Sequence, residues 1–232
     1  MIRDPLLLVP GLACTAALWR DQVAALGAGR TVTVADHTRG ETIADIAAAI
    51  LAEAPPRFAL AGLSMGGYLA FEILRRAPER VSRLALLDTQ ARADPPESRE
   101  IRLQQIAIAE GGGFAKIAAL LYPRLVAPAR LDDADLAGLV RAMADATGPA
   151  AFVRQQKAIL TRPDSRPSLA AVRCPTTVIV GEEDVITPVA LAREMSDAIA
   201  GARLVVVPGS GHLTTLEAPD ATSAALRAWL EG

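Results

Sequence analysis

A serine flanked by glycines stands where an apolar run gives way to a helix-like stretch, in Leu60–Ala70 (LAGLSMGGYLA). Glycine weakens strands and helices unless the backbone needs a conformation that side chains would prevent. A strand that ends in Gly-x-Ser-x-Gly and turns at once into a helix is typical of a nucleophile elbow, whose tight turn projects the serine away from the sheet. Ser64 is therefore a candidate nucleophile, and side chains at Gly62 and Gly66 should collide with the neighbouring strand and helix. A glycine-rich turn without a catalytic role is the alternative.

A serine nucleophile needs a general base, and the base needs a carboxylate that orients it. The chain has two histidines. His212 follows the last predicted strand, which places it at the same sheet edge as Ser64, whereas His37 precedes the serine and is interpreted as an ordinary loop residue. Asp184 follows the next-to-last predicted strand and lies between Ser64 and His212, in the order serine, acid, histidine. Asp88, at the end of the run LALLD, is the rival acid, with a turn or capping role as its alternative.

These groups can meet only if the elements around them form one sheet. Six short runs are nearly all apolar, as strands buried on both faces are, and they alternate with helix-like stretches. This alternation predicts an α/β fold with a parallel sheet, helices on both faces, and ligands at the carboxyl ends of the strands. The predicted strands are Leu6–Val9, Thr31–Ala35, Phe58–Gly62, Leu84–Leu87, Thr177–Val180 and Leu204–Val207. The predicted helices between and after them are Ala16–Leu26, Thr42–Ala54, Gly67–Arg76, Pro188–Ala200 and Ala221–Leu230.

The alternation is interrupted once, between Ala91 and Ala171, where the sequence indicates helices without strands. Because this segment follows a strand end, above the edge where ligands bind, it is interpreted as a helical lid. The predicted organisation is a core of residues 1–90 and 172–232, with a lid of residues 91–171 inserted in it. The predicted lid helices are Pro96–Ala109, Phe114–Leu121, Asp133–Ala144 and Ala151–Leu160.

Several apolar lid residues are candidates to line an acyl pocket, with burial in the lid's own core as the alternative. The wider set is Phe114, Leu121, Tyr122, Leu125, Met143 and Phe152. Among them, Tyr122, Met143 and Phe152 are the residues predicted to form the substrate pocket.

The balance of acidic and basic residues indicates which classes of partner the protein can have. The chain of 232 residues carries 24 basic and 26 acidic residues, a formal net charge of -2, and the two signs are well mixed. This balance argues against nucleic acid or an anionic membrane surface as the main partner and favours a small ligand. No stretch is long enough to span a bilayer.

The two cysteines, Cys14 and Cys174, are too few for a disulfide framework and are interpreted as free thiols in a reducing compartment. Asp4 and Pro5 interrupt a weak resemblance of the N-terminus to an export signal, so a cytoplasmic location is expected.

Three motifs, each at a predicted strand end, identify a resemblance that covers nearly all of the chain outside the lid. They are GLSMGG around the serine, GEEDVITP with Asp184, and GHLTTLEAP with His212. The chain resembles α/β-hydrolase-fold serine hydrolases, in particular bacterial carboxylesterases, enol-lactonases and cofactor-free haloperoxidase-like esterases. It departs from them in lacking sequence for two leading strands, so a shortened parallel sheet of about six strands is expected. It also has Pro10–Gly11 where the family has His-Gly.

The resemblance implies ester hydrolysis through an acyl-enzyme, with Ser64 as nucleophile, His212 as base and Asp184 as orienting acid. It assigns the oxyanion hole to the backbone N–H groups of Leu12 and Met65. Cys14 should then be close to the oxyanion loop. No metal or organic cofactor is implied, and the expected partner is a small-molecule ester or lactone. Lactonase activity is the alternative, and a ligand-binding receptor with a hydrolase pocket is the alternative from another functional class.

Overall fold

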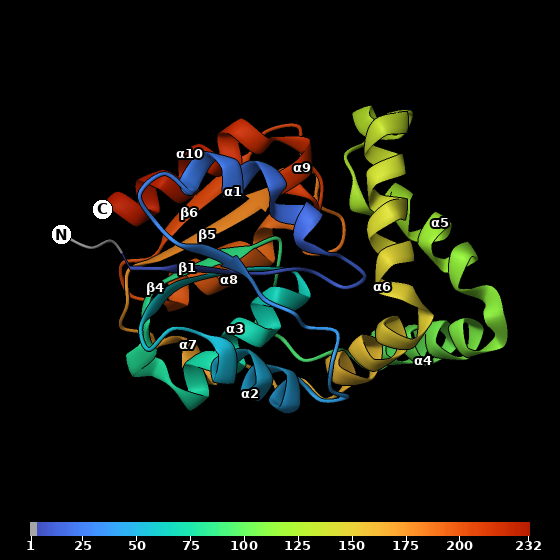
Figure 1. The fold of residues 1–232 in the computed structure, drawn as a ribbon, viewed down its shortest axis with the longest axis horizontal. Coiled ribbons are helices and arrows are strands. Elements are labelled where there is room, and N and C mark those ends of the chain that lie inside the picture. The colour runs from blue at the N-terminus through green and yellow to red at the C-terminus, as the bar shows by residue number, and fades with distance from the viewer. Residues whose placement is uncertain (1–3) are drawn as a thin grey trace.

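The computed structural model describes residues 4–232, which form a single six-stranded parallel sheet with helices on both faces (Figure 1). The strand order is β2-β1-β3-β4-β5-β6, and each neighbouring pair is parallel. The predicted parallel sheet of six strands is therefore confirmed. The strands are β1 (Leu6–Val9), β2 (Val32–Val34), β3 (Phe58–Leu63), β4 (Val81–Leu87), β5 (Thr176–Gly181) and β6 (Arg203–Val207).

Alternate residues of one strand supply two hydrophobic cores, because successive side chains of a strand point to opposite faces of the sheet. In β1, Leu7 and Val9 belong to one core and Leu6 and Leu8 to the other. The first core is covered by α2 (Ile43–Glu53), α3 (Met65–Arg76) and α8 (Val189–Ala198). The second is covered by α1 (Arg20–Leu26) and α10 (Pro219–Glu231), on the opposite side of the sheet in Figure 1. Burial on both faces explains why the strands are almost entirely apolar.

Three helices stand together at one end of the sheet, at the right of Figure 1. They are α4 (Pro96–Ile108), α5 (Phe114–Leu125) and α6 (Ala134–Leu160). A single π-helical turn, Ala109–Gly113, joins α4 to α5, with Gly112 in the left-handed region at φ 84°. The helices predicted over Asp133–Ala144 and Ala151–Leu160 form the two parts of α6, which meet at a kink where Gly148 has non-helical φ 73° and is followed by Pro149.

No helix within residues 4–232 is long and apolar enough to cross a membrane. The remaining elements are short. The short elements are η1 (Ala16–Trp19), η2 (Pro78–Arg80), η4 (Pro128–Arg130), α7 (Arg166–Leu169) and α9 (Thr214–Glu217).

The start of α3 lies against the sheet without room for side chains at two glycines. A Cβ atom on Gly66 would overlap the carbonyl oxygen of Val9 in β1. One on Gly62, at the end of β3, would overlap the carbonyl group of Gly66. The predicted collisions with the neighbouring strand and helix are confirmed. The obstacles are backbone atoms that a side-chain movement cannot clear, so these positions require glycine.

This packing predicts the effect of one added methyl group. We expect Gly66→Ala to lower the free energy of unfolding by about 2 kcal/mol or more, because an overpacked site must shift backbone. Gly138→Ala, in an open position of α6 where nothing lies within 4 Å of the added Cβ, is the matched control. It should stabilise the protein by roughly 0.5–1 kcal/mol through helix propensity. Urea denaturation measures both changes, and a Gly66→Ala protein as stable as wild type would contradict the close approach.

Candidate active site

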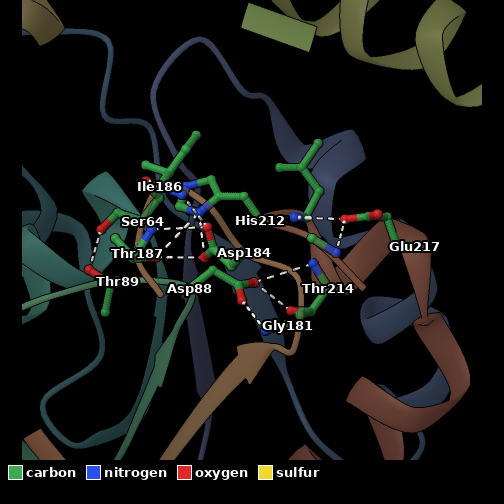
Figure 2. Close-up of polar contacts among 12 residues, drawn as sticks. Ser64, Asp88, Thr89, Gly181, Asp184, Ile186, Thr187, His212, Thr214 and Glu217 are labelled. Carbon is green, nitrogen blue, oxygen red and sulfur yellow. Dashed lines mark hydrogen bonds and ion pairs between the residues drawn. The ribbon is translucent and has the colours of Figure 1, made fainter. Parts of the chain in front are cut away.

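Ser64 occupies a strained turn between β3 and α3. Its backbone has φ 53° and ψ -112°, outside the conformations that non-glycine residues usually adopt. Such a residue costs of order 1–3 kcal/mol and persists only where its surroundings hold it. Here the Ser64 N–H donates to the carbonyl of Leu87 at 2.9 Å, and the Thr89 hydroxyl donates to the carbonyl of Ser64 at 2.7 Å. The turn therefore presents the Ser64 hydroxyl above the carboxyl edge of the sheet (Figure 2).

His212 connects the serine to a carboxylate (Figure 2). Its Nε2 atom lies 2.9 Å from Ser64 Oγ, and its Nδ1 atom lies 2.8 Å from Asp184 Oδ2. The ring is buried, with 2% of the residue exposed. With Nδ1 donating to the carboxylate, Nε2 of the neutral ring is free to accept the Ser64 proton. The three residues that the sequence analysis singled out are thus brought together in a hydrogen-bonded chain.

Asp184 is held as a carboxylate by four donors. Its Oδ1 accepts from the N–H groups of Ile186 at 2.8 Å and Thr187 at 2.9 Å. Its Oδ2 accepts from the Thr187 hydroxyl at 2.6 Å in addition to His212. Burial alone would raise the pKa of Asp184, but the attraction of His212 and these hydrogen bonds lower it to about 2. Conversely, burial would lower the pKa of His212, while the charge of Asp184 raises it above its ordinary value.

Asp88, the rival acid, forms no hydrogen bond with the histidine ring in the described structure. It accepts from the Gly181 N–H at 3.0 Å, and from the N–H and hydroxyl of Thr214 at 3.2 and 2.6 Å. It is fully buried, and burial together with the nearby charge of Asp184 raises the pKa of Asp88 to about 8. Asp88 therefore connects the end of β5 to the start of α9, two residues beyond His212.

Glu217 in α9 holds the loop that carries the histidine, a role that sequence reasoning did not assign to it. Its Oε1 accepts from the N–H groups of Gly211 at 3.0 Å and Leu213 at 3.1 Å, on either side of His212. Its Oε2 accepts from the Ala127 N–H at 2.7 Å. The signal was present in the sequence, since Glu217 is the acidic residue of the GHLTTLEAP motif.

The loop after β1 is held by two buried side chains. His37 Nε2 lies 2.8 Å from the carbonyl oxygen of Gly11, and Gln155 of α6 accepts from the Ala13 N–H at 3.0 Å. Ala13 itself adopts φ 55°. His37 is thus more than the ordinary loop residue that the sequence suggested, because it supports the loop after Pro10. Burial lowers the pKa of His37, which favours a neutral ring that donates from Nε2.

The backbone N–H groups of Leu12 and Met65 have no hydrogen-bond acceptor among residues 4–232. Met65 is the first residue of α3, where the helix dipole favours an anion. Cys14 follows in the same loop as a free thiol, as expected, and its Sγ lies 3.4 Å from the carbonyl oxygen of Leu12. Burial raises the pKa of Cys14 to about 12, so this thiol stays protonated at neutral pH.

A cavity of about 230 Å³ opens beside Ser64, His212 and Leu12. Four of the apolar residues considered from the sequence line it, namely Phe114, Leu121, Leu125 and Phe152. A larger cavity of about 460 Å³, around Arg75, Val81 and Cys174, includes none of Ser64, Asp184 and His212.

Tyr122 and Met143 do not belong to the lining, which corrects their predicted place in the pocket. The Tyr122 hydroxyl donates to the carbonyl of Arg130 at 2.8 Å, and Met143 is buried in the second core with residues of β1 and β3. Both residues are apolar at helical spacing, and each lies on a helix side that faces protein instead of the cavity.

Comparison with known proteins agrees with this fold. The chain matches the alpha/beta hydrolase family over residues 6–225. A thermophilic esterase from Thermogutta terrifontis, solved with malate bound, is 31% identical, with a TM-score of 0.90 over 98% of this chain and 89% of that one. The enol-lactonase from Burkholderia xenovorans LB400 is 26% identical, with a TM-score of 0.87 over 99% of this chain and 92% of that one. A relative from Azorhizobium caulinodans named "Putative carbamate hydrolase RutD" is 27% identical over 93% of this chain and 87% of its own length.

The two histidines should titrate on opposite sides of the ordinary imidazole value. The pKa of His212 is raised by Asp184 and that of His37 is lowered by burial, relative to 6.5. We expect Asp184→Asn to lower the pKa of His212, because the protonated ring loses its negative partner while it remains buried. Nuclear magnetic resonance of the ring protons measures both values. Asp197→Asn, which removes an exposed carboxylate, is the control and should shift neither. A His212 pKa below 6.5 in the unmodified protein would contradict the buried ion pair.

Proposed function

Because the chain belongs to the alpha/beta hydrolase family, we propose that it is a serine esterase that cleaves carboxylic esters of small or medium acyl groups. The single observation that carries this proposal is the hydrogen-bonded chain from Ser64 Oγ to His212 Nε2, at 2.9 Å, and from His212 Nδ1 to Asp184, at 2.8 Å. A nucleophile, a base and an orienting carboxylate in this order are the groups that acyl transfer requires.

In the first half of the reaction, Ser64 Oγ attacks the ester carbonyl while His212 Nε2 takes the serine proton. Asp184 keeps the ring in the tautomer whose Nε2 can accept this proton and stabilises the positive charge that develops. The N–H groups of Leu12 and Met65 bind the oxyanion, and loss of one such donor costs on the order of 3 kcal/mol. His212 then gives its proton to the leaving alcohol oxygen as the carbon–oxygen bond breaks, which leaves an acyl group on Ser64.

In the second half, a water molecule replaces the alcohol. The oxygen of this water attacks the acyl carbonyl while His212 takes one of the water protons. The N–H groups of Leu12 and Met65 bind the oxyanion that forms. The proton returns to Ser64 Oγ as the acyl–serine bond breaks, and the carboxylic acid leaves. Serine, histidine and water complete the cycle with no further reactant.

We also propose that residues 91–171 act as a lid that sets the substrate range. The helices α4, α5 and α6 contribute much of the cavity wall, including Phe114 and Phe152, while Ser64, Asp184 and His212 come from the ends of the strands. Contacts with the non-reacting part of a substrate can position its carbonyl, so changes in this segment should alter selectivity among esters. Gln155 of α6 adds a direct connection between this segment and the loop of Leu12.

Lactone hydrolysis is the second candidate, because a lactone is a cyclic ester that the same groups can open. The similarity to the Burkholderia enol-lactonase favours it. Carbamates belong in the same substrate panel because of the Azorhizobium relative. A receptor without catalysis is disfavoured, since binding alone needs no base hydrogen-bonded to a serine. Turnover of a panel of esters, lactones and carbamates of graded chain length decides among the three substrate classes.

The assignment of the nucleophile predicts a single site of covalent labelling. We expect a fluorophosphonate to modify the protein once, at Ser64, because only an activated serine next to an oxyanion hole reacts readily. Mass spectrometry of the labelled protein identifies the site. Ser64→Ala should not be labelled and should lack turnover on every ester of the panel, and labelling that persists in this variant would place the nucleophile elsewhere.

The assignment of the acid predicts a ranking of two variants. Asp184→Asn should lower kcat by roughly 10⁴-fold, as in a comparable triad, because the ring adopts the wrong tautomer. Asp88→Asn keeps an oxygen acceptor for Thr214 and removes no hydrogen bond to His212, so kcat should fall by no more than about tenfold. Steady-state kinetics on one ester measures both, with circular dichroism as the control for folding. The reverse ranking would make Asp88 the acid.

A further inference from the structure

We propose that the substrate carries a carboxylate in addition to the group that is cleaved, and that Arg102 and Gln105 of α4 bind this carboxylate. Both residues line the cavity that also contains Ser64 and His212. The inference rests on the proposed function, because it assigns a second recognition site within the same cavity. It concerns the chemical class of the substrate, which the hydrogen-bonded chain of Ser64, His212 and Asp184 leaves open.

The first argument is the charge of the cavity wall. Arg102 and Arg124 line the cavity, and Asp94 is the one carboxylate among the described lining residues. Both oxygens of Asp94 are occupied, since Arg102 Nε donates to Oδ2 at 2.6 Å and Arg162 Nη2 donates to Oδ1 at 2.7 Å. Arg162 is buried, with its guanidinium over the Tyr68 ring. Two guanidinium groups thus share one carboxylate, and Arg124 adds a third positive charge, which leaves this side of the cavity with excess positive charge.

The second argument is the direction of a hydrogen-bonded chain on α4 and α6. Arg102 Nη1 donates to Gln156 Oε1 at 2.8 Å. A guanidinium can only donate, so this atom of Gln156 must be the oxygen, and its Nε2 donates to Gln105 Oε1 at 2.6 Å. The orientations of both amides follow from the arginine. The remaining polar atom of the Gln105 side chain is therefore an NH₂ group, which can only donate.

Two donors are left without partners at this wall. Neither Arg102 Nη2 nor Gln105 Nε2 has an acceptor among residues 4–232, and neither is among the side-chain atoms buried without a partner. Both atoms therefore remain accessible on residues that line the cavity. A carboxylate offers two oxygens and one negative charge, which matches one guanidinium N–H and one amide N–H beside excess positive charge. An ester carbonyl is uncharged and uses the Leu12 and Met65 donors, so the carboxylate is a separate group of the substrate.

The test compares charged and neutral esters of matched length. One series contains monomethyl esters of succinic, glutaric and adipic acid against methyl esters of simple alkanoic acids, which puts the carboxylate on the acyl side. The other contains acetate esters of ω-hydroxy acids against alkyl acetates, which puts it on the alcohol side. In at least one series, the wild-type kcat/KM should be roughly tenfold or more higher for the charged member, as expected for a charge-assisted hydrogen bond.

Two variants locate the preference. Arg102→Gln removes the charged donor, and the ratio of charged to neutral kcat/KM should fall to about one. Since this change also removes a partner of Asp94, Gln105→Glu is the second variant. It keeps an acceptor for Gln156 and places a carboxylate at the site, so the ratio should fall below that of the wild type by repulsion. Arg141→Gln, on an exposed residue of α6 outside the cavity lining, is the matched control and should leave the ratio unchanged.

The outcomes separate this inference from the proposed function. If neutral esters are cleaved and neither series favours the charged member, the esterase assignment stands and the carboxylate site is wrong. A preference that survives both Arg102→Gln and Gln105→Glu also overturns the site. If no ester is cleaved, calorimetric titration of glutarate into the wild-type protein tests the site directly. Binding that Gln105→Glu weakens at least tenfold would support it, and absence of binding would overturn it.

Discussion

The hydrogen bond between Asp184 and His212 is the interaction on which the rest of the site depends. A carboxylate buried at the edge of a sheet is unstable unless donors surround it, and Asp184 has four. These donors fix the loop after β5, and the histidine fixes the loop after β6. Because His212 also contacts Ser64, at 2.9 Å, the same charge orients the group that can activate the serine. The hydrogen bonds that stabilise the buried charge of Asp184 are therefore the same ones that set the geometry of the site.

Two further buried acidic side chains extend the same principle around Asp184 and His212. Asp88 connects β5 to the start of α9, and Glu217 binds the N–H groups on both sides of His212. Glu217 accepts from N–H groups of loops, which have no regular partners of their own, whereas Asp88 accepts from Gly181 at the end of β5 and from Thr214 at the start of α9. Glu217 thereby holds the backbone on either side of His212, and Asp88 holds the end of β5, which leads to Asp184. This explains why the loops at the carboxyl edge of the sheet can keep Ser64, His212 and Asp184 within hydrogen-bond distance.

The helices α4 to α6 bring a different kind of chemistry to the same cavity. Through Gln155 they support the loop of Leu12, and through Phe152 they make part of the wall apolar. Through Arg102 they add positive charge, which comes from a helix far along the chain from Ser64. Ser64, Asp184 and His212 come from the sheet edge, whereas much of the remaining cavity wall comes from the helices, which is the basis of the substrate-range role proposed for them.

The sequence by itself determined the strands and the helices of the core, and it singled out Ser64, Asp184 and His212, which the structure joins by hydrogen bonds. These follow from local patterns, namely apolar runs, a glycine-rich turn and the order of polar residues after strands. Only the tertiary structure decided that Tyr122 and Met143 face protein while Phe152 faces the cavity. It also decided the supporting roles of His37, Gln155 and Asp88, because each depends on a contact between segments far apart in the chain. The same holds for the direction of the hydrogen bonds from Arg102 through Gln156 to Gln105. Helical spacing gives the side of a helix that is apolar, but the partner that covers this side is a property of the whole fold.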